Sequence, residues 1–257
     1  MSANALPKVV DEVSDLLAKI VIPLYVERKH RAPPEAVATG FLIRHGQQHF
    51  LVTAAHAIET IRTQKFYYYV SRTHWQQLSG QVISKGDPAD VAVVKLTGDA
   101  MPPYPALGKC AVDSSWLRPH HLPRGGKQYL ILGFPASQSK PDGIGRHINS
   151  TIWGYRHDSI PDAEYAAHGI NAQFHIALPF NKKKSWDSDW KQRNFPPPTG
   201  LSGAPIFELW DSDIANASPK FSIVGVGTAH RKQPGLLIGT DAAIVLAMIA
   251  DAIKEKI

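Results

Sequence analysis

The chain has 257 residues, of which 44% are hydrophobic and 19% are charged, a balance that predicts a globular protein and excludes a disordered one. Its formal net charge of +6 favours anionic partners but is too small to indicate nucleic-acid binding by itself. No apolar run approaches the roughly 18 residues that a membrane-spanning helix needs, so we expect no membrane partner.

The cysteine content and the first residues bear on the cellular compartment. Cys110 is the single cysteine, so an intramolecular disulfide and a zinc site built on several thiolates are excluded. Asp11, Glu12 and Asp15 interrupt the pattern that an export signal would need at the N-terminus. We therefore expect a cytoplasmic protein.

The first predicted elements are a helix and three strands. Residues 8–20 carry apolar side chains at helical spacing, and a lead-in strand follows at 20–26. Two short apolar runs, 41–44 and 50–54, flank a glycine-containing segment that is typical of a β-hairpin. Further strands are expected at 66–71, 81–83, 91–96, 128–133, 148–155, 174–178, 206–209, 221–226 and 236–238.

The later part of the chain supplies a connector and a second helix. Residues 101–126 are rich in proline and lack a clear period, which indicates a connector between two groups of strands. Near the C-terminus, Thr240 is a candidate N-cap for a helix. The apolar stripe of that helix consists of Leu246, Ile249, Ile253 and Ile257.

Many short strands with a helix at each end predict an all-β fold, and two antiparallel β-barrels would remove the exposed sheet edges. The expected segments are an N-terminal helix and lead-in strand at 1–35, a first barrel at 36–115, a second barrel at 116–238 and a C-terminal helix at 239–257. The first barrel would carry His56 and Asp90, and the second would carry Ser202.

Three short segments contain residues suited to catalysis. They are TAAH at 53–56, DVAVVKL at 90–96 and GLSGAP at 200–205. Each has an ordinary explanation when taken alone, as a polar strand end, a turn residue or a tight turn. Their joint occurrence in the order His, Asp, Ser on a chain of strands favours a common function.

The chemistry of nucleophilic catalysis explains these residue types. The hydroxyl of Ser202 is a poor nucleophile until a base takes its proton, and His56 can serve as that base near neutral pH. Asp90 can hold the imidazole in the correct tautomer. Glycines around the serine allow a tight turn in which the N–H groups of Gly200 and Ser202 converge on an oxyanion.

These three segments resemble the signature segments of chymotrypsin-fold (trypsin-like) serine proteases, in particular the disulfide-free bacterial type. The likeness extends over residues 36–250. It implies an endopeptidase that forms an acyl-enzyme on Ser202, with His56 as general base, Asp90 as orienting acid and Gly200 as second oxyanion donor. It implies a protein or peptide substrate and requires neither a cofactor nor a metal.

The resemblance also suggests how substrate binds. The strand that contains Val226 and Gly227 would pair with the substrate backbone, and Gly235 would form the far wall of the specificity pocket. Pro196 stands where tryptic enzymes keep an acid, so specificity for Lys or Arg is not supported. Leu201 replaces the acid that pairs with a freed N-terminus, so activation by N-terminal cleavage is not expected.

Other residues of the sequence allow alternative interpretations. Asp87 competes with Asp90 for the acid role, although Asp90 directly precedes the strand. There is no HExxH motif, and the neighbours His120 and His121 would point apart in a strand, so we expect no metal. The basic-aromatic segment 182–190 is more simply explained as a solvated loop than as a nucleic-acid site, and we do not expect a nucleic-acid partner.

A second hypothesis from another class is a catalytically silent binding module that keeps the trypsin-like fold, with its cleft blocked by the loop 182–198. For an active protease in the cytoplasm, restraint by a regulatory protein partner is expected, as in a bacterial stress or anti-phage system. Labelling of Ser202 by an active-site probe would separate the two hypotheses.

Overall fold

The computed structural model describes residues 17–27, 34–59, 66–71, 74–97, 110–120, 124, 127–141, 148–183, 185–186, 191–209 and 221–254. These residues are mostly β and form two eight-stranded sheets and one two-stranded sheet. The strand pairs are antiparallel, apart from one short parallel pair between residues 43–44 and 112–113 in the first sheet. No helix among the described residues is long and apolar enough to cross a membrane.

The first sheet is built from the N-terminal half of the chain. Its strands are β1 (Val21–Val26), β2 (Glu35–His45), β3 (Gln48–Ala54), β4 (Phe66–Ser71), β5 (His74–Gln77), β6 (Gly80–Lys85), β7 (Val91–Leu96) and β8 (Val112–Asp113). They lie in the order β5-β4-β1-β2-β3-β7-β6, and β8 pairs with β2. The predicted hairpin is confirmed as β2 and β3, which are joined by a two-residue turn.

The second sheet uses the C-terminal half. Its strands are β9 (Gln128–Gly133), β12 (Trp153–Asp158), β13 (His175–Pro179), β14 (Ser185–Trp186), β15 (Gln192–Arg193), β16 (Pro205–Leu209), β17 (Phe221–Arg231) and β18 (Leu236–Asp241). Their order is β13-β18-β17-β16-β9-β12-β14-β15. The small sheet pairs β10 (Ser139–Pro141) with β11 (Ile148–Ser150).

Some strand predictions need correction. The single strand expected at 148–155 is two strands, β11 and β12, in different sheets. The segment 101–126 is not only a connector, because it contains β8 and the 3-10 helix Ser114–Trp116. Strand β5 was not predicted. Three further 3-10 helices span Ala136–Gln138, Asp162–Glu164 and Ala166–His168.

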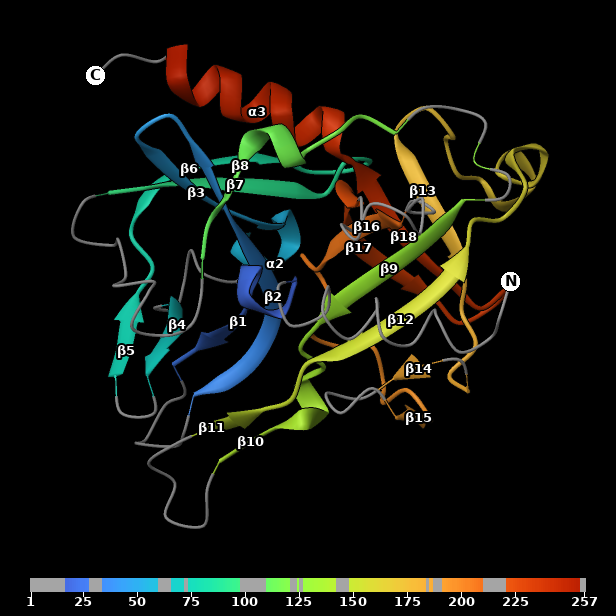
Figure 1. Ribbon diagram of the computed structural model, residues 1–257, viewed down its shortest axis with the longest axis horizontal. Helices are drawn as coiled ribbons and strands as arrows, with labels where there is room; N and C mark the ends of the chain where they lie inside the picture. The colour runs from blue at the N-terminus through green and yellow to red at the C-terminus, as the bar shows by residue number, and fades with distance from the viewer. Residues whose placement is uncertain are drawn as a thin grey trace, which may run out of the picture.

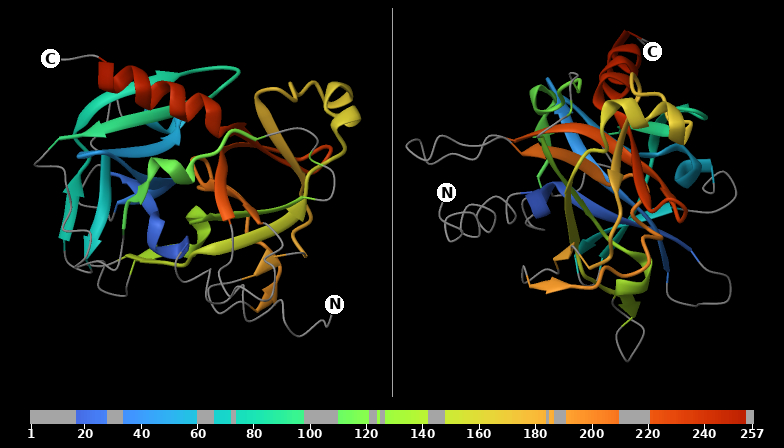
Figure 2. Two further views of the ribbon diagram at one scale, coloured as in Figure 1. Left: turned by 45° about the horizontal axis from the view of Figure 1, so that its top comes forward. Right: turned by 90° about the vertical axis from the view of Figure 1, so that its right-hand side faces the viewer.

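A shared apolar seam joins the two large sheets. One core cluster contains buried residues of both sheets, among them Phe41 and Val52 from the first and Leu132 and Phe207 from the second. The buried face of α3 (Ala242–Lys254) completes this cluster, and Figure 1 shows α3 lying across one end of both sheets. The left view of Figure 2 shows the two sheets side by side under the same helix. Each large sheet also packs its own separate apolar cluster, one built from residues of the first half of the chain and one from residues of the second half.

The helix predictions are only partly tested. Residues 17–20 are helical, and the rest of the predicted N-terminal helix lies outside the described residues. The N-cap prediction is wrong, because Thr240 lies within β18 and Oδ1 of Asp241 accepts the hydrogen bond from the N–H of Ala243 at 2.7 Å. Of the predicted stripe, Ile249 is buried, whereas Ile257 lies outside the described residues.

Candidate active site

Strand pairing brings His56 and Asp90 together. In the antiparallel pair of β3 and β7, Ala54 lies opposite Val91. The chain that leaves β3 and the chain that enters β7 therefore meet at one end of the sheet. The short helix α2 (Ala55–Glu59) begins there, and the N–H of Ala55 donates to the carbonyl of Asp90 at 3.0 Å.

The side chain of Asp90 holds His56 with two hydrogen bonds. Nδ1 of the imidazole lies 2.6 Å from Oδ2 of Asp90, and the backbone N–H of His56 donates to Oδ1 at 2.9 Å. An ionised carboxylate can only accept, so the ring proton sits on Nδ1 and Nε2 is left as the basic nitrogen. The imidazole is half exposed, whereas the carboxylate is 19% exposed.

Electrostatics raise the basicity of this imidazole. The hydrogen bond to Asp90 is the largest influence and raises the pKa of His56 above its usual 6.5. Burial lowers this pKa, while the charges of Asp90, Glu59 and Asp87 raise it further. Asp87 therefore acts on His56 through its charge, and the hydrogen-bonded partner is Asp90.

Asp90 occupies an unusual backbone conformation. Its φ is +49°, the left-handed region that non-glycine residues seldom adopt. The turn is closed by the carbonyl of Gly86, which accepts 3.0 Å bonds from the N–H groups of both Ala89 and Asp90. Backbone strain of this kind is often found at functional sites, where surrounding contacts maintain it.

The serine loop requires its two glycines. Gly200 has a φ of +95° and Gly203 has a φ of +89°. A Cβ on Gly200 would lie 2.6 Å from the backbone nitrogen of Ala136, and a Cβ on Gly203 would lie 2.1 Å from the carbonyl oxygen of Thr39. Neither contact is possible for a larger residue, so the close packing of this loop depends on glycine at both positions.

Thr39 of β2 anchors the serine loop, a role that no sequence pattern around this residue indicates. Its hydroxyl donates to the carbonyl of Gly200 at 2.7 Å, and its N–H donates to the carbonyl of Ser202 at 2.9 Å. The carbonyl of Thr39 accepts in turn from the hydroxyl of Thr53 at 2.7 Å. Both threonines are fully buried, so the loop of the second sheet is fixed against strands of the first.

The same packing places the serine loop against strand β3, which leads to His56. A Cβ on Gly203 would lie 2.9 Å from Cα of Thr53, and His56 follows Thr53 by three residues. Within the described residues, the hydroxyl of Ser202 makes no hydrogen bond, to His56 or to any other group. In the same part of the chain, the N–H groups of Gly200 and Ser202 have no protein acceptor.

A cavity of about 350 Å³ opens beside Ser202. Its buried lining is mostly aliphatic, with Thr228 as its buried polar residue, and His230 and Lys232 are its basic lining residues. Burial and the charge of Lys232 lower the pKa of His230, which favours a neutral imidazole. The full lining is Ile131, Pro197, Pro198, Thr199, Leu201, Ser202, Gly227, Thr228, Ala229, His230, Lys232, Leu237 and Ile238.

Two predicted substrate-binding residues do not line this cavity, although Gly227 does. Val226 is completely buried in the seam between the sheets because its side chain points into the apolar core. Gly235 lies in the turn between β17 and β18, where its carbonyl accepts a 2.8 Å bond from the N–H of Phe180. His230 was not given a role from sequence, and only the folded strand brings it to the cavity.

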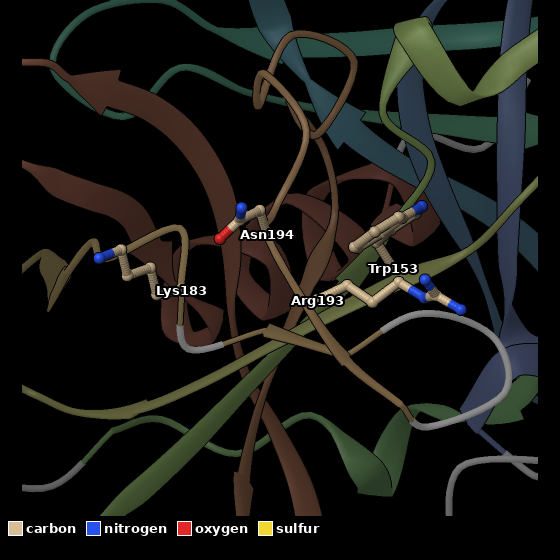
Figure 3. A pocket seen from close by; sticks show the side chains of 4 residues that line it. All are labelled: Trp153, Lys183, Arg193 and Asn194. Atoms are coloured by element: carbon tan, nitrogen blue, oxygen red, sulfur yellow. The ribbon is translucent and has the colours of Figure 1, made fainter.

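A second hollow, of about 580 Å³, lies by the segment that precedes the serine loop. Trp153, Lys183, Arg193 and Asn194 line it. Figure 3 shows that the side chains of Lys183 and Arg193 extend in opposite directions, with the guanidinium group on the side of the indole nitrogen. None of the three predicted catalytic residues lines this hollow.

The polar groups elsewhere offer no metal site in the described part of the chain. His120 is buried and contacts the hydroxyl of Tyr129, with Oε2 of Glu208 at 3.6 Å from its Nε2. His121 and the side chains of Trp186 and Trp190, in the basic-aromatic segment 182–190, lie outside what the structure describes. Comparisons of the chain with protein-family models and with curated protein sequences give no match.

Proposed function

We propose that this protein is a serine endopeptidase that hydrolyses peptide bonds through an acyl-enzyme on Ser202. The observation that carries the proposal is the 2.6 Å bond between Nδ1 of His56 and Oδ2 of Asp90. This bond fixes the tautomer that a general base needs. Thr39 anchors the serine loop against the same sheet.

The proposed mechanism has two stages, acylation of Ser202 and hydrolysis of the resulting ester. Ser202 attacks the scissile carbonyl carbon while Nε2 of His56 takes the hydroxyl proton, and Asp90 stabilises the imidazolium. The N–H groups of Gly200 and Ser202 donate to the oxyanion of the tetrahedral intermediate. His56 then gives its proton to the leaving amine, and a water activated by the same imidazole hydrolyses the ester.

The bond between Ser202 and His56 would form when substrate binds. Catalytic hydrogen bonds are often long or poorly aligned without substrate and shorten in the Michaelis complex. The N–H groups without a protein acceptor at Gly200 and Ser202 support this view, because an oxyanion hole has to be open to substrate.

The fold proposed for this function is the double β-barrel of the chymotrypsin type. It is supported by the two eight-stranded sheets, by the separate apolar cluster in each and by the seam between them. In the same proposal, the serine loop needs no ion pair to a freed N-terminus. Leu201 is buried in the apolar cluster of the second sheet, and its N–H donates to the carbonyl of Pro198 at 3.0 Å.

The cavity beside Ser202 supports a substrate with an uncharged aliphatic residue before the scissile bond. Its buried walls include Ile131, Leu237 and Ile238, each at most 6% exposed. Burying a charged side chain against such walls is costly without a partner, whereas an aliphatic side chain gains from leaving water. No carboxylate is among the described residues that line the cavity, so a Lys or Arg side chain would find no partner there.

A fluorophosphonate probe tests the proposed function directly, since it reacts with activated serines. We expect covalent labelling of the wild-type protein at Ser202, located by peptide mass spectrometry. Labelling should disappear in Ser202→Ala and persist in Ser79→Ala, which replaces an exposed serine remote in sequence from the site. Absence of labelling in folded wild-type protein would overturn the proposal.

One observation favours a different function, a silent module that binds a protein partner through this fold. That observation is the missing hydrogen bond at the Ser202 hydroxyl within the described residues. A stable complex with a partner, isolated without cleavage and with an unlabelled Ser202, would favour this second function.

A further inference from the structure

We propose that Thr240 and His175 are positioning residues that hold the Asp90 turn in its catalytic conformation from the opposite sheet. This inference rests on the proposed protease function. Two side chains of the second sheet bind the two carbonyl groups that directly precede Asp90. The hydroxyl of Thr240 donates to the carbonyl of Ala89, and Nε2 of His175 lies 2.9 Å from the carbonyl oxygen of Pro88.

Strand register explains why both side chains reach the same turn. His175 of β13 and Thr240 of β18 are directly opposite each other in an antiparallel pair. Side chains of directly opposed residues project from the same face of a sheet. Both residues are buried, so their hydrogen bonds form away from bulk water.

Both ring nitrogens of His175 face carbonyl oxygens, Nε2 that of Pro88 at 2.9 Å and Nδ1 that of Asn171 at 3.1 Å. A carbonyl can only accept and a neutral imidazole carries one N–H, so the bond to Pro88 forms in the tautomer with the proton on Nε2. The backbone of His175 is itself held, because its carbonyl accepts a 2.9 Å bond from the guanidinium of Arg124. Arg124 is only 1% exposed, and Oδ1 of Asp162 pairs with it at 3.1 Å.

The Asp90 turn needs support of this kind. Within its own sheet, the carboxylate of Asp90 is bound by the backbone N–H and Nδ1 of His56, and its carbonyl accepts from the N–H of Ala55. Asp90 has a left-handed φ of +49°, a strained backbone conformation that persists only where surrounding contacts maintain it. Bonds to the carbonyls of Pro88 and Ala89 restrain the two peptide units before Asp90, and so restrain the direction of its carboxylate.

The same strands hold the serine loop. Thr240 lies opposite Val226 of β17. The next residue, Gly227, exchanges 2.7 Å hydrogen bonds with the loop, from the N–H of Gly203 and to the carbonyl of Ala204. Strands β17 and β18 thus form one rigid frame that fixes both the acid turn and the nucleophile loop. Misplacement of a catalytic group by about 1 Å can cost about 100-fold in rate.

The test compares isosteric and conservative variants at each position. Thr240→Val removes the hydroxyl at nearly constant volume, and Thr240→Ser retains it. We expect Thr240→Val to lower kcat by about 10-fold to 100-fold with KM nearly unchanged, and Thr240→Ser to restore kcat to within about threefold of wild type. His175→Phe and His175→Gln form a second pair, since glutamine keeps an N–H donor near the position of Nε2.

A proton NMR measurement reports on the positioned bond without any turnover. The proton between His56 and Asp90 should give a far-downfield resonance, because the heavy atoms are only 2.6 Å apart. We expect this resonance to weaken or shift upfield in Thr240→Val and His175→Phe and to remain in the two conservative variants. Circular dichroism and thermal melting establish that each variant is folded.

The outcomes separate this inference from the proposed function. An active wild type whose kcat and downfield resonance are unchanged in folded Thr240→Val and His175→Phe would overturn the positioning role and leave the protease proposal intact. A wild-type protein without probe labelling would overturn the protease proposal. The NMR comparison would still decide whether these side chains hold Asp90 against His56.

Discussion

The backbone N–H of Thr39 donates a 2.9 Å hydrogen bond to the carbonyl oxygen of Ser202. These residues belong to different sheets and lie far apart in the chain, so the bond joins the first half of the site to the second. Together with the bond from the hydroxyl of Thr39 to the carbonyl of Gly200, it fixes the peptide unit before Leu201 and the peptide unit after Ser202. The serine loop is therefore held by a strand that carries none of the three predicted catalytic residues.

Thr39→Val should destabilise the protein and reduce probe labelling of Ser202. Valine has the shape of threonine but no hydroxyl, so the carbonyl of Gly200 loses its donor in a buried position. The expected loss is about 1–3 kcal/mol in the free energy of unfolding, measured by chemical denaturation. Thr39→Ser is the control and should stay close to wild type in labelling. Equal labelling rates in Thr39→Val and wild type would contradict the anchoring role.

Gly203→Ala should be far more damaging than Gly46→Ala. Both glycines have positive φ, at +89° and +59°, so an L-residue is strained at either position. A Cβ at Gly203 would also meet the carbonyl of Thr39 at 2.1 Å, whereas nothing lies within 4 Å of a Cβ at Gly46. We expect the difference in unfolding free energy to exceed about 2 kcal/mol, with labelling lost only in Gly203→Ala. Similar effects of the two substitutions would show that the loop can move away from the first sheet.

The pH dependence of kcat/KM should report the pKa of His56. A general base works only when unprotonated, so the rate should fall as the pH drops through this pKa. Because the hydrogen bond to Asp90 raises the pKa, the acidic limb should have its midpoint above the usual histidine value of 6.5. A midpoint below that value, or no acidic limb, would contradict the pairing of His56 with Asp90.

Asp90→Asn should lower kcat by about 10⁴, the loss known for this substitution in serine protease triads. Asparagine removes the negative charge and can present its N–H₂ group to the imidazole, which favours the wrong tautomer. Removal of the largest influence on the pKa of His56 should also move the acidic limb to lower pH. Asp87→Asn is the matched control, because this residue acts only through its charge and should shift the limb slightly.

A peptide library should show cleavage after aliphatic residues, with at least about tenfold lower kcat/KM after Lys, Arg, Asp or Glu. The reason is the aliphatic lining of the cavity beside Ser202. Leu237→Asp places a carboxylate in this lining and should increase cleavage after Lys or Arg relative to wild type. Preferred cleavage of the wild type after a charged residue would show that a different surface receives that side chain.

Short-range patterns were enough to predict most of the strands and the hydrogen-bonded pair of the site. The runs at 66–71, 91–96 and 128–133 are strands with those bounds, since alternation and β-branched residues are local signals. His56 and Asp90 could be matched because each stands at the end of an apolar strand. Their 2.6 Å bond then follows from one antiparallel pairing of β3 with β7.

What the tertiary structure alone decided is how distant segments hold this site together. Thr39, His175 and Thr240 each act through a hydrogen bond to a backbone carbonyl. A carbonyl is present at every residue, so such a bond leaves no pattern in the sequence of either partner. Thr240 was predicted as a helix cap because threonine before a helix usually serves there, and only the folded sheet turns its hydroxyl toward Ala89. The sequence by itself determined which side chains are suited to the proposed reaction, because residue type and order are local properties. The packing of one sheet on the other decided what keeps them in place.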